Sequence, residues 1–435
     1  MAPFRPEDLR SGGGPVDVTD ETPLLVDPCL PGAGLLLARG SLEGWLSDRL
    51  GRPAQVTLRR LRYKPGTSLV LGFDLATDAP GAPRSCLAWA YADGSQAKLG
   101  KTLERLPPST FLAYDARLTV LVTTAGGDRY LPALARLERP GGLARTVQRV
   151  LPGLDAPEDV RVRTLRHNPG RRWVGCLESG GDGAGTPVRA VLRAYPDQVQ
   201  MGRAWGSYAE FARRGAPTQR PVGRFRKAAV LAVTWAEGRQ LTRVDEPDRW
   251  RDVGATLARL HGAPRRRLER IGVESEIDAV SRTAGNIASL LPDLVPVTTS
   301  LSERVAGVLR EVPRDLVTIH GDFSPDQVVL DGHGEPCVID LDAAGVGASA
   351  ADVGCLLASI PRGDEHLAEA ALEGYGLVRR PPDPRAVAGY ALAYGLRKAI
   401  DPFRDCAPEW PAAVTRRVLE LEAHCDRLEK GEVIS

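Results

Sequence analysis

An internal repeat is the feature that most constrains how this 435-residue chain can fold. When the sequence is shifted by 104 residues, Val56–Asp93 aligns without a gap on Val160–Asp197, with 13 identities in 38 positions. Average residue frequencies would give roughly three. The matches include the Pro-Gly pairs of LRYKPGTSLV and LRHNPGRRWV and the ends AYAD and AYPD. The repeat predicts two copies of one β-rich unit, although two unrelated Pro-Gly hairpins would account for part of the match.

Each copy is predicted to contain three strands, because apolar runs alternate with a Pro-Gly turn and a Gly- and Pro-rich loop. In the second copy we expect strands at Val160–Arg166, Arg172–Glu178 and Val188–Tyr195, then a helix near Trp205–Arg214 and a strand at Val230–Trp235. From Asp248 onward the apolar spacing is mostly helical. A β-rich part followed by an α-rich part indicates an α+β protein with two lobes.

Charge, cysteine spacing and targeting signals exclude several classes of protein. The chain has 57 Lys and Arg against 55 Asp and Glu, a formal net charge of +2, which gives no electrostatic reason to expect nucleic-acid or membrane binding. Its seven cysteines are dispersed, so neither a disulfide framework nor a structural zinc site is expected. The first residues lack the apolar segment of a secretory signal, and apolar stretches are too short to span a bilayer. We therefore expect a cytoplasmic protein.

Three polar side chains are expected to meet at the rim of a small hairpin near residue 330. The predicted strands Val328–Leu330 and Cys337–Ile339 flank a Gly-rich turn; Asp322 precedes the first strand, Gln327 stands at its start, and Asp340 ends the second. Two carboxylates and an amide oxygen are hard ligands of the kind that a Mg²⁺–phosphate complex uses. Taken singly, each would be an ordinary turn residue. Together they indicate Mg²⁺-dependent phosphoryl transfer, which needs positioning, charge neutralisation and a carboxylate for the acceptor hydroxyl.

The segment HGDFSPDQ followed by IDLD resembles the catalytic and metal-binding loops of the aminoglycoside phosphotransferase / choline kinase superfamily, whose fold is similar to that of protein kinases. The resemblance implies an ATP- or GTP-dependent enzyme. It assigns roles residue by residue: the catalytic base Asp322; the metal ligands Gln327 and Asp340, with Asp342 for a second metal; and the supporting residues His320 and Asp352. Gln replaces the family's usual Asn, a variant similar to bacterial maltokinase-like and glucosamine-kinase-like members.

The resemblance also implies a division into three parts. Residues 151–240 would be a kinase-like N-lobe and residues 241–435 a mostly helical C-lobe with the catalytic and metal-binding loops. For residues 1–150 the internal repeat alone predicts a cap domain with a diverged copy of the N-lobe sheet. Val230–Trp235 resembles the hinge that holds the adenine, which assigns Val233 and Trp235 to nucleotide binding.

The phosphate-binding position of the N-lobe departs from the family pattern. Arg193 stands where kinases carry a Lys on the third strand, and Glu210 on the following helix is its expected partner. Arg contacts phosphate with a different geometry, so a degraded N-lobe in a pseudoenzyme is the alternative. The first copy has Trp89 at the matching position, and we expect nucleotide in the second copy alone.

Other nucleotide motifs are near misses. Gly94–Thr102 resembles a P-loop but has five residues between its glycines where four are required. Gly345–Ala350 fits Gly-x-Gly-x-x-Ala, yet it lies late in the chain without a strand–helix–strand series around it. A kinase-like module that binds a nucleotide or peptide without turnover is the non-enzymatic alternative.

The acceptor is the least constrained part of the prediction. Residues 352–435 carry 14 acidic and 11 basic side chains, which favours a cationic acceptor such as an amino sugar. Other sugars, natural-product intermediates and Ser or Thr of a ribosomal peptide precursor remain alternatives. The candidate acceptor-site residues are Asp364, Glu365, Glu369, Glu373, Tyr390, Tyr394, Arg397, Arg404 and Trp410.

Overall fold

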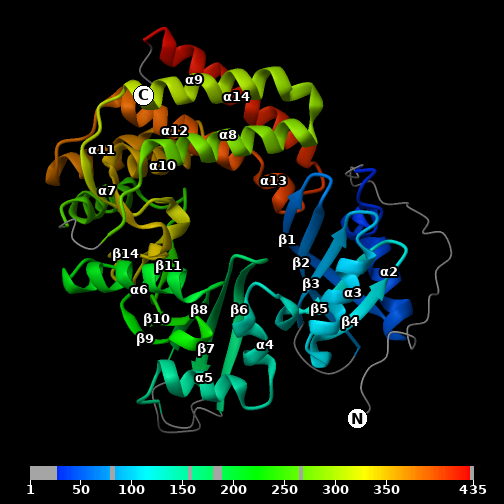
Figure 1. Ribbon diagram of the computed structural model, residues 1–435. Coiled ribbons are helices and arrows are strands. Elements are labelled where there is room, and N and C mark those ends of the chain that lie inside the picture. Colours follow the sequence, from blue (N-terminus) through cyan, green and yellow to red (C-terminus); the bar gives the residue numbers. More distant parts are fainter. Residues whose placement is uncertain (1–26, 79–83, 155–158, 180–188, 264–267, 432–435) are drawn as a thin grey trace. The chain divides into compact units, whose positions relative to one another are not determined.

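The computed structural model describes residues 27–78, 84–154, 159–179, 189–263 and 268–431. Antiparallel sheets fill the first half and helices most of the second, which confirms the predicted α+β class (Figure 1). The chain forms two compact units. The first comprises Met1–Gln198, Phe225–Val230 and Asp401–Ala412, and the second Val199–Arg224, Leu231–Ile400 and Ala413–Ser435. The three-part division expected from the sequence stays a prediction.

The first copy of the repeat forms a five-stranded antiparallel sheet with the order β1-β2-β3-β5-β4. Its strands are β1 Ala54–Lys64, β2 Ser68–Thr77, β3 Arg84–Tyr91, β4 Phe111–Asp115 and β5 Val120–Thr124. Helices α1 Ala33–Leu37, α2 Arg39–Leu50 and α3 Gln96–Arg105 belong to this copy, while α4 Pro132–Glu138 and α5 Gly142–Val150 lie in the segment that precedes the second copy. The three predicted strands are present, and a helix and two further strands complete the unit.

The second copy has the same strand order, β6-β7-β8-β10-β9. Its elements are β6 Val160–Asn168, β7 Arg172–Ser179, β8 Arg189–Ala194, α6 Gln198–Arg213, β9 Pro221–Phe225 and β10 Val230–Thr234. The register is repeated as well, since Val70 faces Trp89 and Val174 faces Arg193. The predicted duplication is therefore confirmed in topology and register, although the matches at Gly81 and Pro83 lie outside the described residues. Helix α6 begins seven residues before the expected Trp205.

The two copies share unusual backbone features that the sequence alignment does not contain. Thr119 and Ala229 precede β5 and β10, and both have the left-handed backbone that non-glycine residues seldom adopt, with φ of 51° and 52°. The carbonyl of each accepts a hydrogen bond from the amide of the tyrosine that follows the third strand: Tyr91 at 3.1 Å and Tyr195 at 3.0 Å. The duplication thus extends to the fifth strand of each sheet.

Each Pro-Gly turn is held by an aspartate from the segment that precedes its copy. In the first copy, Asp27 accepts hydrogen bonds from the Gly66 amide and the Tyr63 hydroxyl, at 2.9 and 2.8 Å. In the second, Asp128 accepts from the Gly170 amide at 2.7 Å and lies 3.1 Å from His167 Nε2. Tyr63 and His167 are equivalent under the 104-residue shift. Because Asp128 occupies the Gly170 amide, this turn differs from a glycine-rich loop whose amides face a phosphate.

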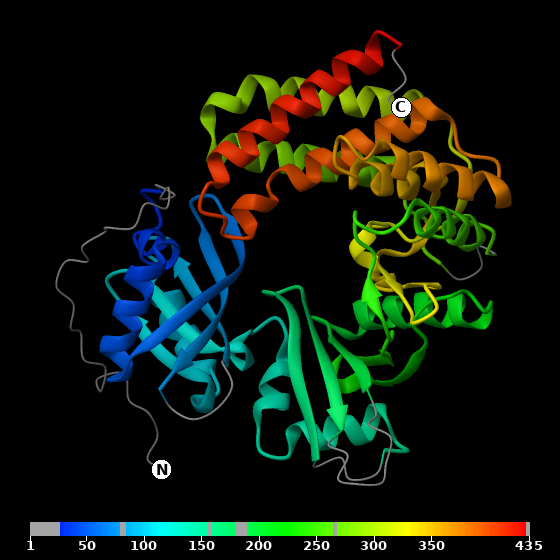
Figure 2. The same ribbon diagram turned by 180° about the vertical axis from the view of Figure 1, so that it is seen from behind.

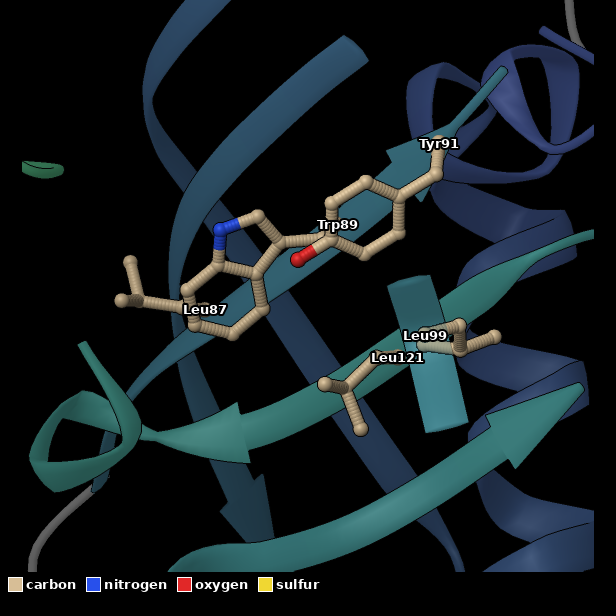
Figure 3. Close-up of a cluster of buried hydrophobic side chains, with 5 residues drawn as sticks. All are labelled: Leu87, Trp89, Tyr91, Leu99 and Leu121. Carbon is tan, nitrogen blue, oxygen red and sulfur yellow. The ribbon is translucent and has the colours of Figure 1, made fainter. Parts of the chain in front are cut away.

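The copies differ on the sheet face that carries Arg193. In the first copy this position is Trp89, which belongs to a buried cluster with Leu87, Tyr91, Leu99 and Leu121 (Figure 3). The same offset places Leu106 at the position of Glu210, and Leu106 packs against this cluster. The two positions that carry Arg193 and Glu210 in the second copy are therefore apolar in the first. The indole of Trp89 cannot neutralise phosphate charge as a guanidinium can.

The helical part contains two small sheets and a layer of long helices. The sheets are β11-β13-β14 and β12-β15, with bounds β11 Arg239–Gln240, β12 Leu316–Ile319, β13 Val328–Leu330, β14 Pro336–Val338 and β15 Gly345–Ala348. The helices are α7 Pro247–His261, α8 Val273–Leu290, α9 Val295–Glu311, α10 Ser349–Ala358, α11 Glu365–Val378, α12 Pro384–Ala399, α13 Asp401–Arg404 and α14 Trp410–Glu429. Helices α8, α9 and α12 pack together, as both views show (Figure 2). Among the described helices, none combines the length and apolar character needed to cross a bilayer.

Asp27 and Asp128 hold equivalent Pro-Gly turns, and we expect the same substitution to have unequal effects at the two sites. Asp128→Asn should lower the free energy of unfolding by about 1–3 kcal/mol. The side-chain NH₂ group of asparagine cannot accept a hydrogen bond, so one of the donors that now face Asp128 would lose its acceptor. Asp27→Asn is the matched control: Asp27 is partly exposed, so water can replace the lost acceptor and the cost should be smaller. Urea denaturation of both variants measures the difference. Equal losses would contradict the role of Asp128 as the buried latch.

Candidate active site

The His320-Gly321-Asp322 loop follows β12 and is pressed against a second loop at Ala343. Gly321 has φ of +85°, and a Cβ atom there would lie 2.3 Å from the Ala343 carbonyl oxygen. Both the backbone angle and the close approach require glycine. Because Ala343 follows Asp342 directly, this packing brings Asp322 next to the segment that carries the predicted metal ligands.

His320 joins the same two loops. Its Nε2 donates a hydrogen bond to the Ile339 carbonyl at 2.8 Å, while its Nδ1 accepts from the Asp322 amide at 3.3 Å. These two bonds are compatible with the neutral imidazole that carries its proton on Nε2. The ring is fully buried and packs edge-on against Phe323. These contacts are the ones that a loop-holding role for His320 requires.

Asp352 on α10 braces the loop through both carboxylate oxygens. One oxygen accepts from the His320 amide at 2.6 Å and the other from the Gly321 amide at 2.8 Å. The carboxylate also lies 3.1 Å from Nε2 of His261 on α7. Asp352, His320 and His261 are buried and Gly321 partly so, and these hydrogen bonds replace the water that a buried carboxylate loses.

His261 extends this network, a role that sequence reasoning missed. Its Nδ1 lies 2.8 Å from the Tyr375 hydroxyl on α11. Burial raises the pKa of Tyr375 to about 12, so the hydroxyl keeps its proton and can donate it to Nδ1. His261 Nε2 then carries the proton that faces Asp352. The sequence offered no signal for this chain of contacts, because its members are 91 and 114 residues from His261.

The predicted hairpin rim is formed by β13 and β14. Val328 pairs with Val338, and just beyond this pair the Ile339 amide donates to the Gln327 carbonyl at 2.9 Å. Asp340 follows immediately, with a left-handed backbone at φ of 62° that an aspartate seldom adopts. Sparsely populated backbone states of this kind gather at functional sites.

Gln327, Asp340 and Asp342 offer a donor set that fits a hard divalent cation. The Gln327 side-chain NH₂ donates to Asp326 at 2.9 Å, so its carbonyl oxygen is the end suited to a metal. Among the described residues, no three His, Cys, Asp or Glu side chains gather as a metal site. Mg²⁺ is compatible with so few carboxylates, because water and substrate phosphates supply its remaining ligands.

The predicted nucleotide-binding residues lie on the second copy of the repeat. Arg193 is on β8 and is buried, and Val233 is on β10 and is buried too. Glu210 on α6 is also buried, and its carboxylate accepts from Arg213 at 2.8 Å. Trp235 directly follows β10 and is partly exposed. The pairing of Arg193 with Glu210, and the nucleotide contacts of all four, stay predictions.

Two rival motifs do not form their loops. Gly100, inside the P-loop-like stretch, lies within α3 instead of a turn. The Gly345–Ala350 stretch begins as β15, which pairs antiparallel with β12, and continues as α10. A dinucleotide fingerprint requires a parallel strand–helix–strand unit, so this segment has another role.

Two cations on α12 lie beside Asp322. Arg397 Nη2 is 4.0 Å and Lys398 Nζ 3.9 Å from Asp322 Oδ1. Arg397 and Tyr394 are among the residues expected at the acceptor site, whereas Lys398 was not predicted there. The candidate carboxylates make other contacts: Glu373 pairs with Arg251, and Glu365 accepts from the Gly363 amide.

Residues 179–390 match the model of the phosphotransferase enzyme family. None of the curated proteins compared with the chain matches it. The matched region contains the loop with Asp322 and the β13–β14 hairpin, and it ends before Arg397 and Lys398.

Solved structures similar to this chain include choline kinase from Cryptosporidium parvum, with 11% identity, a TM-score of 0.49, and coverage of 67% of this chain and 96% of that one. Macrolide 2'-phosphotransferase from Brachybacterium faecium has 20% identity, a TM-score of 0.44, and coverage of 64% and 98%. Spectinomycin phosphotransferase in complex with ADP and spectinomycin has 11% identity, a TM-score of 0.45, and coverage of 62% and 93%.

The Asp352 network generates a stability prediction. Asp352→Ala should lower the free energy of unfolding by about 3 kcal/mol or more, because buried donors of His320 and Gly321 would lose their acceptor. Asp331→Ala is the control, since that exposed carboxylate accepts amide bonds within its own turn and should cost much less. Chemical denaturation measures both; an Asp352 loss no larger than the Asp331 loss would contradict the bracing role.

Proposed function

We propose that this protein is a phosphotransferase that moves the γ-phosphate of ATP or GTP onto a hydroxyl group of a small molecule. One observation carries the proposal: Asp322 lies on a loop braced by Asp352 and packed, through Gly321, against the segment with Asp340 and Asp342. The match of residues 179–390 to the phosphotransferase family supports it.

Phosphoryl transfer requires few catalytic groups, and the His320-Gly321-Asp322 loop would supply the central one, the Asp322 carboxylate. The acceptor oxygen forms a bond to the γ-phosphorus, the bond from that phosphorus to the β–γ bridging oxygen breaks, and its electron pair leaves with the nucleoside diphosphate. Asp322 orients the acceptor hydroxyl and takes its proton. The side chain is 37% exposed, so a substrate hydroxyl can approach the carboxylate.

Gln327, Asp340 and Asp342 would hold the metal. Bound there, Mg²⁺ would neutralise phosphate oxygens and orient the transferred group. The left-handed backbone at Asp340 turns the chain out of β14 directly at the rim, and the Leu341 amide is fixed by the Tyr208 hydroxyl at 3.3 Å. These contacts hold the donor set in place before substrate binds.

We further propose that the second copy of the repeat binds the nucleotide. Arg193, with Glu210, would contact the phosphates, and the backbone near Val233 and Trp235 would hold the base. The burial of Arg193 and Glu210 supports this proposal, since buried charges need opposite charges nearby. The first copy has Trp89 in an apolar cluster at this position and is assigned no nucleotide.

The proposed acceptor is a small hydroxyl compound; an amino sugar, another sugar and a natural-product intermediate are the candidates that the sequence suggests. Kinship with maltokinase-like and glucosamine-kinase-like proteins stays a prediction. Phosphorylation of Ser or Thr in a ribosomal peptide precursor and a non-catalytic binding module are the alternatives. The intact set of Asp322, Gln327, Asp340 and Asp342 favours an enzyme over a binding module.

Asp322→Asn should abolish phosphoryl transfer while nucleotide binding persists, because the variant keeps the shape of the side chain but loses the proton acceptor. Release of ADP measures turnover, and calorimetric titration measures nucleotide affinity. Asp331→Asn, at the far end of the same hairpin, is the control and should retain activity. Turnover of Asp322→Asn within tenfold of the unchanged protein would overturn the assignment.

Asp340→Ala should weaken binding of MgATP far more than binding of metal-free ATP, since a lost charged ligand acts through the metal. Titrations with and without Mg²⁺ measure the two affinities. Asp331→Ala should change neither. Equal losses of both affinities in Asp340→Ala would show that this carboxylate has no metal role.

A further inference from the structure

The two cations beside Asp322 are built into the helical layer. Arg397 and Lys398 lie in the last turn of α12, within 4.0 Å of the catalytic carboxylate. Asp322 Oδ1 is itself buried and accepts no hydrogen bond from the described residues. Each cation alone would be a weak contact at this distance, but together they surround one side of the reacting group with positive charge.

Neighbouring residues fix the positions of both cations. The Arg397 guanidinium donates to Glu276 on α8 at 2.5 Å. Lys398 Nζ lies over the Tyr394 ring, 5.2 Å from its centre, and the Arg397 guanidinium is 5.9 Å from the same ring. Burial raises the pKa of Tyr394, so this side chain stays a neutral phenol. The Lys398 side chain is 39% exposed, and a ligand can therefore reach its ammonium group.

The positions of these residues indicate which substrate the cations face. The metal donors Gln327 and Asp340 are at the rim of the β13–β14 hairpin, whereas Arg397 and Lys398 come from α12. In-line transfer places the acceptor and the leaving nucleotide on opposite sides of the phosphoryl group, and Asp322 must contact the acceptor. Helix α12 contacts Asp322 and carries none of the metal donors, and it is therefore the element that faces the acceptor.

We propose, on the basis of the phosphotransferase activity proposed above, that the acceptor is an anion: a hydroxyl compound that also carries a phosphate or carboxylate group. Lys398 binds this anionic group, and Arg397, held by Glu276, adds its positive charge. A cationic amino sugar would be repelled by the same pair. The acidic balance of residues 352–435 does not oppose this, because charge acts locally and is screened within about 10 Å.

A binding experiment tests the anion site without requiring turnover. Inorganic phosphate is titrated into the full chain saturated with Mg²⁺ and a non-hydrolysable ATP analogue, whose three phosphate groups keep inorganic phosphate out of the nucleotide site. Lys398→Gln should weaken phosphate binding at least tenfold. Lys101→Gln, which removes the same charge from an exposed position on α3, should leave it unchanged. Absence of phosphate binding, or equal binding by the unchanged protein and Lys398→Gln, would overturn the anion site.

A turnover experiment tests the substrate class. Sugars of one skeleton are supplied with MgATP as neutral, amino, carboxylate and phosphate forms, alongside wider pools of the same four classes. The anionic forms should have at least tenfold higher kcat/KM than the amino forms, and Lys398→Gln should reduce this preference by raising the acceptor KM. The carboxylate and phosphate arms distinguish the two sources of negative charge.

The outcomes separate the inference from the proposed function. Transfer mainly to neutral or amino compounds, or a Lys398→Gln effect confined to the KM for ATP, would overturn the anionic acceptor while leaving the phosphotransferase intact. Phosphate binding that depends on Lys398, without ADP release for any pool, would instead contradict the proposed function and retain the anion site.

Discussion

The site depends on one buried carboxylate. Asp352 accepts hydrogen bonds from the successive amides of His320 and Gly321 and contacts His261, so it ties α7 and α10 to the loop that carries Asp322. A buried charge is tolerated only when such donors compensate for lost hydration, and each contact therefore sustains the others. With the loop fixed in this way, Gly321 packs against Ala343, and the segment with Asp322 becomes a neighbour of the segment with Asp340 and Asp342.

The duplicated sheets separate what the fold requires from what the chemistry requires. Both copies keep the strand order, the Pro-Gly turn with its aspartate latch, and the left-handed residue before the fifth strand. The side chains on one sheet face have diverged: Trp89 packs in an apolar cluster, while Arg193 keeps a charge at the equivalent position. The strand order, the turn and the left-handed residue are restricted by backbone geometry. The side chains on a sheet face are restricted only by the need to pack or to find a polar partner.

The charge distribution around Asp322 shows why net charge is a poor guide to a substrate. The C-terminal residues are acidic as a group, yet Arg397 and Lys398 lie within 4.0 Å of the Asp322 carboxylate. Glu276 contributes negative charge there while anchoring Arg397. On α11, Glu373 pairs with Arg251 and Glu365 accepts from the Gly363 amide. Electrostatic interactions at a few ångströms therefore decide what can bind.

The sequence alone determined the duplication, the α+β class and the hairpin that carries Gln327 and Asp340, because each leaves a local pattern: an ungapped repeat, a change of apolar spacing, and two short strands around a Gly-rich turn. The catalytic role of Asp322 rests on a local motif and was inferred from resemblance. The partners of Asp352 and the approach of Lys398 to Asp322 were decided by tertiary structure. His261 and Asp352 are 91 residues apart, and 76 residues separate Asp322 from Lys398 in the sequence. Contacts over such separations arise only when helices pack, and no local pattern of residue types encodes them.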